Sequence, residues 1–250
     1  MGLGQLVFFI LLLTLHLFRH FGGHKWINSF MISLGQKKNI DLRIDSPYPS
    51  ITQLNYEQEW KLKSQWIDLA IMGLCFLLYN KSSTLIYIEI QKYGIPYLLL
   101  SFFILLFLQD TYFYFTHRML HIPFLYKKIH QVHHKSKAPS TNAAFSHHPA
   151  EKFIELLFYP LIILIIPLHP GALITFLTYS TITNFIGHSG FEIRKIPSIG
   201  KHHNKYMATT VFHEMHHRYP NKNFGLYLTF WDRLLSSTDK KYEGRLSNNL

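Results

Sequence analysis

The sequence predicts an all-α integral membrane protein, in which about four to five transmembrane or hairpin helices carry a cytosolic, histidine-rich helical cap. Three observations predict this fold. Long apolar stretches recur along the 250 residues, and 48% of all residues are hydrophobic. Basic residues lie between those stretches and give a formal net charge of +11. The chain also has 17 histidines, most of them in its second half and clustered beside apolar stretches.

The first apolar run covers residues 3–21 and is long enough to cross a bilayer. A cleaved signal peptide would have a basic start and small residues at a cleavage site. Neither is present, so we expect a retained helix. Residues 22–65 are polar and mixed, which predicts an extramembrane connection with a surface-lying helix. His16, His20 and His24 are expected to lie at the membrane interface.

Further apolar stretches predict the rest of the bundle. A second span is expected from about residue 66 to residue 90, interrupted by YNKSS, and a third over residues 95–115. Two shorter stretches, 153–168 and 172–187, flank the turn PLHPGA and predict a tight helical hairpin.

The distribution of lysine and arginine predicts the orientation. Residues 117–137 carry five basic residues and no acid, and residues 191–223 are also basic, so both segments should face the cytoplasm. The late histidine groups then meet on one side of the membrane. No nucleic-acid motif is present, and the positive charge favours an anionic membrane surface. A single cysteine, Cys75, rules out a disulfide framework.

Four histidine groups carry the candidate chemistry. They are His117 and His121 in THRMLH, His130, His133 and His134 in HQVHH, His188 in NFIGHSGFE, and His213, His216 and His217 in HEMHH. Spacings of three and four place side chains on one face of a helix. Neutral imidazole binds divalent iron, zinc, copper or nickel, and one ion uses about four to six ligands. Nine convergent histidines therefore suit two ions that share a site.

Several other residues are candidates for supporting roles. Asp110 and Tyr114 share one helical stripe with His117 and His121, so Asp110 either fixes the tautomer of a ligand histidine or lies at the membrane boundary. His148 and Asn184 either complete the metal shell, with Asn184 holding a metal-bound water, or serve as helix-cap or loop residues.

The stretch VFHEMHHRYP permits a competing interpretation. His213 and His217 could be zinc ligands of an intramembrane metalloprotease with Glu214 as its base. That reading leaves the histidines between residues 117 and 134 unexplained. A metal transporter would place its histidines along a path through the bilayer, whereas these collect on one side. We therefore favour the H-x-x-H-H interpretation.

At these residues the sequence resembles the fatty acid hydroxylase superfamily, also called the sterol desaturase family. The family pattern is H-x3-H, H-x2-H-H and a later H-x2-H-H, and DTYFYFTHRMLH, AFSHHPAE, NFIGHSGFE and KNFGLYLTFWDRL match it as well. The resemblance covers roughly residues 95–240. Two departures are Phe212, where many relatives have histidine, and LLSSTD in place of a glycine-threonine ending.

The resemblance implies a non-haem diiron oxygenase that hydroxylates or desaturates a lipid, whether fatty acyl, sterol-like or another hydrocarbon. It implies two Fe²⁺ ions on the nine histidines as the catalytic centre itself, with zinc as a possible substitute in isolated protein. O2 is the oxidant, and electrons come from an external ferredoxin, reductase or cytochrome b5-like donor.

We expect an N-terminal membrane region over residues 1–94, a catalytic domain like that of the family over residues 95–240 and a polar tail over residues 241–250. The composition of residues 236–250, which are polar and charged, predicts a loose segment. The active site should face the cytoplasm. The absence of an evident retrieval signal and of a fused cytochrome favours a bacterial inner membrane over the endoplasmic reticulum.

Overall fold

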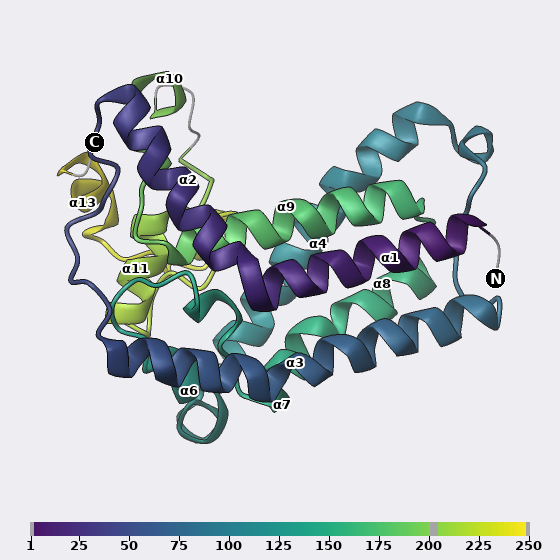
Figure 1. Ribbon diagram of the computed structural model, residues 1–250, viewed down its shortest axis with the longest axis horizontal. Helices are drawn as coiled ribbons and strands as arrows, with labels where there is room; N and C mark the ends of the chain where they lie inside the picture. Colours follow the sequence, from purple (N-terminus) through teal and green to yellow (C-terminus); the bar gives the residue numbers. More distant parts are fainter. Residues whose placement is uncertain (1–2, 201–204, 249–250) are drawn as a thin grey trace.

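The computed structural model describes residues 3–200 and 205–248, and the regular elements in this part of the chain are all helices (Figure 1). The all-α prediction is therefore confirmed. The longer helices are α1 (Leu3–Leu17), α2 (Gly23–Lys38), α3 (Ile51–Asn80), α4 (Gly94–Leu120) and α9 (Pro170–His188).

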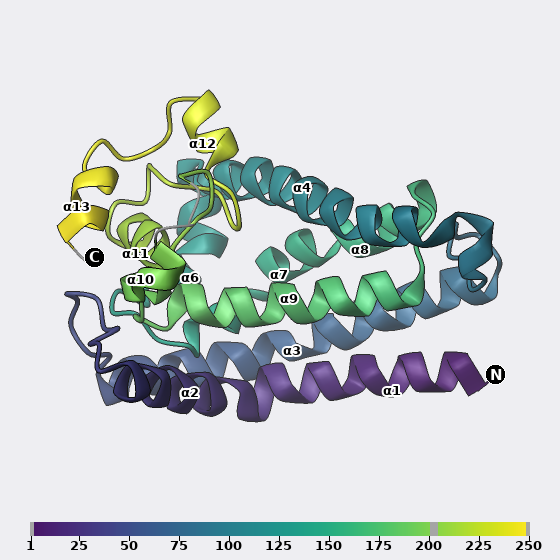
Figure 2. The same cartoon turned by 90° about the horizontal axis from the view of Figure 1, so that it is seen from above.

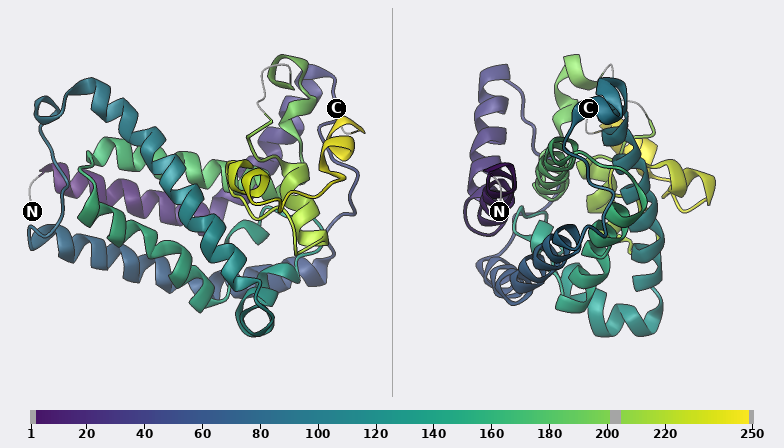
Figure 3. Two further views of the ribbon diagram at one scale, coloured as in Figure 1. Left: turned by 180° about the vertical axis from the view of Figure 1, so that it is seen from behind. Right: turned by 90° about the vertical axis from the view of Figure 1, so that its right-hand side faces the viewer.

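Four of these helices, α1, α3, α4 and α9, form the elongated body of the molecule. Seen from above, α9 lies between α4 and α1, and it packs against both (Figure 2). Seen from behind, α4 crosses the bundle at an angle (Figure 3). Among the described residues, α3 and α4 are long and apolar enough to cross a membrane. Ile95, Leu99 and Phe103 on α4 are each more than 60% exposed, an apolar surface that suits contact with lipid.

The shorter elements complete the bundle and cover one end of it. They are η1 (Phe18–Gly22), η2 (Ile90–Lys92), α5 (Pro123–Leu125), η3 (Tyr126–His130), α6 (Gln131–His134), η4 (Ala143–Phe145), α7 (Pro149–Leu156), α8 (Phe158–Ile165), η5 (Ile193–Lys195), α10 (Pro197–Gly200), α11 (Thr210–Arg218), α12 (Phe230–Leu234) and α13 (Tyr242–Asn248). The helices α2, α6, α10, α11 and α13 gather at the end opposite the N-terminus (Figure 1).

The helix α3, which corresponds to the predicted second span, differs from the predicted limits. It begins at Ile51 rather than near residue 66, because the Ser50 hydroxyl accepts a hydrogen bond from the Gln53 amide and caps it. Three polar residues of the expected connection, Glu57, Lys61 and Ser64, form a buried stripe of this helix instead, and Asp68 continues it. Because they are spaced three or four residues apart, they share one face of the helix, and this face is buried in the protein. The helix ends at Asn80, so the stretch after YNKSS lies outside it.

The third span and the hairpin agree with the prediction in their main features. The helix expected over residues 95–115 is α4, which extends to Leu120. The first arm of the hairpin is divided into α7 and α8, and its second arm is α9. His169 of the turn caps α9, because its Nδ1 accepts a hydrogen bond from the Gly171 amide at 3.0 Å.

The C-terminal tail is helical over residues 242–248 rather than loose, and residues 249–250 lie outside the described part. Tyr242 is 1% exposed and packs against Phe212, with ring centroids 5.2 Å apart. Phe212, the position at which many relatives have histidine, is thus a core residue of α11 that packs against α13. The polar composition of the tail predicted a loose segment because a single buried tyrosine, which anchors it, hardly changes that composition.

Candidate metal centre

The nine histidines expected as metal ligands come together at one end of the bundle. They form one group of five and one group of four, and within each group the nearest ring nitrogens lie within 4.8 Å of one another. The five-membered group comprises His117, His121, His130, His134 and His216, and the four-membered group comprises His133, His188, His213 and His217. The rings of His134 and His217 are 4.9 Å apart, so the two groups are neighbours.

Helical geometry explains how each H-x-x-H-H motif is divided. The first and last histidines are one turn apart and point to the same side, while the residue before the last is rotated from it by about 100°. His130 and His134 therefore join the five-membered group while His133 joins the other. On α11 the division is reversed, because His213 and His217 join the four-membered group and His216 the first. Each motif thus gives two histidines to one group and one histidine to the other.

The histidines turn their Nε2 atoms toward one another. In the five-membered group the Nε2 atom of His130 is 3.0 Å from that of His117 and 3.1 Å from that of His134. In the four-membered group the Nε2 atom of His213 is 2.8 Å from that of His188 and 3.0 Å from that of His217. Such a convergence of ring nitrogens is what a metal ion with imidazole ligands requires.

Oxygen acceptors fix the opposite nitrogen of several rings. The Nδ1 of His117 donates to the Phe224 carbonyl at 2.9 Å, that of His130 to the Glu151 carboxylate at 2.8 Å, and that of His216 to the Lys222 carbonyl at 2.6 Å. In the other group, His188 donates to the Asn184 carbonyl at 2.9 Å and His133 to the Ser146 carbonyl at 3.4 Å. Each of these neutral rings then carries its proton on Nδ1 and a lone pair on Nε2.

This tautomer pattern tests whether a metal fits. His117 and His130 both direct lone pairs into the 3.0 Å gap between their Nε2 atoms, and His133 and His188 do so across 3.4 Å. Two lone pairs at that separation repel unless a cation binds both. Protonation is disfavoured, because burial lowers the pKa of His130 and of His133 well below the usual range. One cation in each group satisfies the chemistry of the donors.

Two residues that the sequence reading did not assign lie beside the centre. Glu151 is fully buried and orients His130, a role that carboxylates often have behind metal-binding histidines. His147 has its ring 4.7 Å from that of His133 and forms a further candidate group with His133 and Glu151. The motif AFSHHPAE contained both residues, but spacing alone did not show which histidine turns toward the centre.

His148 and Asn184, proposed to complete the metal shell, lie outside both histidine groups. The Nδ1 of His148 accepts a hydrogen bond from the Ala150 amide at 3.1 Å and caps α7, so it has the helix-cap role that was left open. Asn184 contributes through its backbone carbonyl, which orients His188.

Asp110 does not contact a ligand histidine. Its Oδ1 accepts hydrogen bonds from the amides of Leu226, Tyr227 and Leu228, at 2.8 Å for Tyr227. It cannot reach His117 on the same stripe, because seven residues of helix separate the two by roughly 10 Å. Asp110 therefore anchors the loop after Phe224, whose carbonyl orients His117.

Tyr114 also points away from the ring nitrogens. Its hydroxyl lies 2.8 Å from the Ser237 hydroxyl and accepts a hydrogen bond from Arg118 at 3.0 Å. It joins α4 to the segment that follows α12. The helical stripe was correctly identified, but only its two histidines enter the centre.

Glu214 is held by two arginines. Its carboxylate lies 2.6 Å from Arg218 and 3.2 Å from Arg245, and its side chain is 2% exposed. A protease base must be able to take a proton from a metal-bound water. Glu214 instead serves as a counter-ion that joins α11 to the C-terminal segment, so the geometry does not support the H-E-x-x-H interpretation.

A second buried cluster includes two histidines that we expected at the interface. His16 and His20 are 6% and 0% exposed, so their side chains lie inside the protein rather than on its surface. The His20 Nε2 lies 2.9 Å from Asp68, and the Lys152 ammonium lies 2.7 Å from the same carboxylate. The buried acid on α3 draws the Lys152 ammonium inward, because an unpaired charge inside the protein is costly, and His20 donates a hydrogen bond to the same acid.

Comparison with known proteins agrees with the motifs and with this geometry. The fatty acid hydroxylase family model matches residues 102–237, which is more than half of the chain. The chain belongs to the fatty acid hydroxylase family. This confirms the resemblance predicted from the histidine motifs, and the matched region begins within α4 and includes all nine histidines of the two groups.

Several relatives of known function are similar to the chain. The Delta(7)-sterol 5(6)-desaturase of Saccharomyces cerevisiae is 31% identical over 147 residues, covering 59% of this chain and 38% of that protein. The Delta(7)-sterol 5(6)-desaturase of Candida glabrata is 28% identical over 169 residues, covering 68% of this chain and 42% of that protein. Human lathosterol oxidase is 28% identical over 205 residues, covering 79% of this chain and 67% of that protein.

The chain thus spans between about two fifths and two thirds of the length of these relatives. All three come from eukaryotes, so the expected preference for a bacterial inner membrane has no support from them. No solved structure matches the chain significantly.

Proposed function

We propose that the chain is a membrane-bound oxidoreductase that uses two iron ions and O2 to introduce a double bond into a sterol. The observation that carries the proposal is the division of nine histidines into two adjoining groups with converging Nε2 lone pairs. Iron held by these histidines would supply the oxidising power that an unactivated C–H bond requires.

The chain's own residues keep the ligands neutral and oriented. Glu151 and the backbone carbonyls of Phe224, Lys222 and Asn184 hold protons on Nδ1, which leaves Nε2 free to bind metal. Burial excludes water from the rings and keeps their pKa values low. We propose that all nine histidines are ligands and that His147 acts behind His133.

The activities named for the relatives favour a sterol over a fatty acyl chain, and desaturation over hydroxylation. The electrons would come from an external donor such as a ferredoxin, a reductase or a cytochrome b5-like protein. We further propose that residues 95–240 carry the chemistry and that residues 1–94 shape the membrane side. The contacts of α1 with α9 and of α3 with α7 and α8 support a single working unit.

The test begins with metal content. The protein is purified in detergent and its metal per chain is measured by elemental analysis, for the wild type, for His130→Ala and for the control His148→Ala. Two irons in the wild type and the control, with loss in His130→Ala, are expected. One zinc ion that remains in His130→Ala would refute the dimetal centre.

The second step tests the reaction. Iron-loaded protein is given lathosterol, O2 and a chemical or enzymatic reductant, and sterols are analysed by mass spectrometry. The expected product has lost two hydrogens. Two bound irons without any oxidation of a sterol would refute the proposed substrate class while leaving the metal centre intact.

A further inference from the structure

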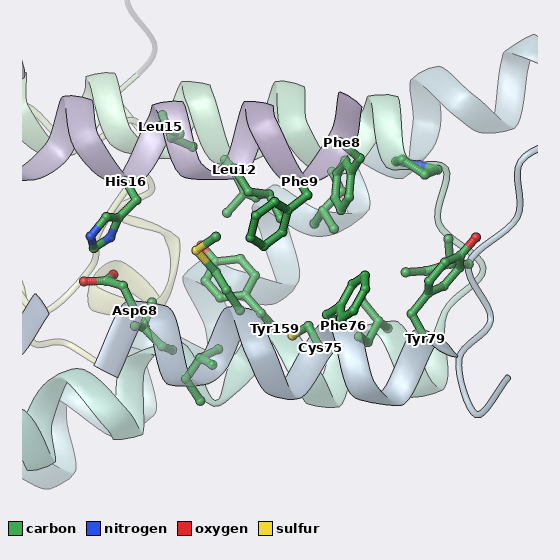
Figure 4. A pocket seen from close by; sticks show the side chains of 18 of the residues that line it. Phe8, Phe9, Leu12, Leu15, His16, Asp68, Cys75, Phe76, Tyr79 and Tyr159 are labelled. Atoms are coloured by element: carbon green, nitrogen blue, oxygen red, sulfur yellow. The ribbon is translucent and has the colours of Figure 1, made fainter. Parts of the chain in front are cut away.

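An apolar chamber lies between α1 and α3, away from the histidine groups. Its cavity volume is about 140 Å³, and it is open to the surroundings along part of its wall. Phe8, Phe9 and Leu12 of α1 face Cys75 and Phe76 of α3 across it (Figure 4). Phe9 is 42% exposed, so the chamber opens between the two helices on their apolar outer side. The apolar lining and the opening suit a lipid whose hydrocarbon part is only partly enclosed between the two helices.

Polar side chains are concentrated at one end of this chamber. His16 faces Asp68 there (Figure 4). Arg19, which lies beside Asp68, also lines the chamber. Asp68 is paired with Lys152 at 2.7 Å and with His20 at 2.9 Å, while an Arg19 nitrogen is 3.9 Å away. His16 is only 6% exposed, and its Nδ1 has no hydrogen-bond partner. A buried imidazole nitrogen without a partner at the wall of a cavity is what a polar ligand atom would satisfy.

A second cavity connects this polar end with the metal centre. Arg19, Asp68 and Tyr159 line both cavities, so the two adjoin. The second cavity is also lined by Phe113, His147 and Asn184.

Those three residues reach both histidine groups. The ring of Phe113 is 4.8 Å from that of His117, and the ring of His147 is 4.7 Å from that of His133. The Asn184 carbonyl accepts the Nδ1 proton of His188. A lipid with one end at the polar cluster would therefore lie next to the oxidising centre.

The charges of the polar end indicate the chemistry of its ligand. Arg19 and Lys152 are balanced by Asp68 and Glu155, and all four line the second cavity. The cluster has no surplus positive charge for a carboxylate or phosphate headgroup. Lys152 already occupies the position beside Asp68 that a metal ion would take. A hydroxyl group fits best, because it can both donate to and accept from the side chains present.

We propose that the chamber between α1 and α3 holds a hydroxylated lipid, with its hydrocarbon body among the apolar side chains and its hydroxyl at His16, Arg19 and Asp68. The inference rests on the proposed function, which supplies an oxidising centre beside the hydroxyl end. It adds that the carbon to be oxidised lies near the hydroxyl rather than far along the hydrocarbon.

Cys75 provides a direct probe, because it is the only cysteine of the chain and lines the chamber. The full-length protein in detergent, without reductant, is treated with N-ethylmaleimide, and alkylation is followed by intact-protein mass spectrometry. Lathosterol is compared with its 3-deoxy counterpart, which lacks only the hydroxyl. We expect both to slow alkylation, with the 3-deoxy sterol requiring a roughly 10- to 100-fold higher concentration, the effect of one hydrogen bond to a charged group.

Two variants separate the polar end from the apolar body. His16→Leu should raise the concentration of lathosterol that protects Cys75 by roughly tenfold and leave the 3-deoxy sterol unchanged. Leu12→Trp should abolish protection by both sterols, because Leu12 lines the chamber. Leu11→Trp is the matched control, because the neighbouring Leu11 is 44% exposed and lies outside the chamber lining.

Absence of protection by either sterol, or equal protection by both, would overturn the proposal, as would equal effects of Leu11→Trp and Leu12→Trp. Sterol oxidation is measured on the same preparation with iron and reductant. Hydroxyl-dependent protection without oxidation would support the chamber and refute the reaction. Oxidation without protection of Cys75 would support the reaction and refute the chamber.

Discussion

The chain buries histidines in two places, and the two places differ in what neutralises them. At the metal centre nine imidazoles face one another through Nε2. At the second cluster, His16 and His20 lie beside Asp68, whose charge is already matched by Lys152 at 2.7 Å. Both places bring ring nitrogens close together. At the metal centre, however, the lone pairs face one another without a cation between them.

This difference shows that a cluster of histidines indicates a metal only when the tautomers require one. Acceptors on Nδ1 force lone pairs toward the middle of the metal centre. In the second cluster the Nε2 of His20 donates to Asp68 and carries the proton, whereas the Nδ1 of His16 has no partner and its tautomer remains free. A free tautomer suits a ligand hydroxyl better than a fixed metal.

The largest difference between the two places should appear when one buried histidine of each is replaced by alanine. His130→Ala removes a buried ring from the five-membered group and should lose at least one of two metal ions, because structural metal ions depend on every ligand. His20→Ala removes an equally buried ring from the second cluster and should keep both ions. Elemental analysis of the two purified variants decides. Equal metal loss from both would show that the second cluster also binds metal.

Acid should destabilise the metal-free protein steeply. Burial lowers the pKa of His130, His133, His134, His213, His216 and His217 well below 6.5. Below about pH 6.5 the unfolded chain therefore binds more protons than the folded chain. The free energy of unfolding is then lost as the pH falls, by about 1.4 kcal/mol per pH unit for each such histidine.

The measurement is the thermal unfolding midpoint in detergent from pH 8 to pH 5, with and without Fe²⁺. Bound metal should move the loss to lower pH, because it competes with protons for the same nitrogens. A midpoint that does not change between pH 7 and pH 5 in the metal-free protein would contradict the neutral, buried state of these rings.

Lys152→Met should lower the stability of the protein through the second cluster and leave metal binding at the nine histidines unchanged. It leaves Asp68 buried with weaker partners, and breaking a buried ion pair costs about 3 kcal/mol or more. The free energy of unfolding from urea titration should fall by that amount while metal per chain stays the same. Lys63→Met removes an exposed pair with Glu59 and should change stability by less than about 1 kcal/mol. A loss of metal in Lys152→Met would show that the two regions depend on each other.

Glu151→Gln should have the smallest effect. The amide keeps an acceptor for the His130 Nδ1 proton but removes the negative charge behind the ring. Metal affinity should fall by about 10- to 100-fold, as for other residues that orient metal-binding histidines. Competition with a chelator measures it, and Glu89→Gln on the exposed surface is the control. Unchanged affinity would mean that Glu151 has a packing role only.

Local patterns predicted much of the site and of the fold. Apolar runs located the helices now labelled α1, α4 and α9. The three- and four-residue spacings selected the nine histidines that the structure brings together. These features could be read directly, because helical periodicity fixes which neighbours in sequence share a face. The polar stripe of α3 was misread for the complementary reason, since polar residues on a buried face look like a loop when their partners are unknown.

The sequence alone determined which histidines are candidate ligands and which segments form apolar helices. Only the tertiary structure decided the division into five and four histidines, the choice of His147 over His148, the loop held by Asp110 and the pairing of Asp68 with Lys152. The Nε2 atoms of His134 and His216, 82 positions apart in the chain, come within 3.1 Å of each other. Periodicity gives the direction of a side chain from its own helix, whereas the side chain that it meets depends on how distant helices pack.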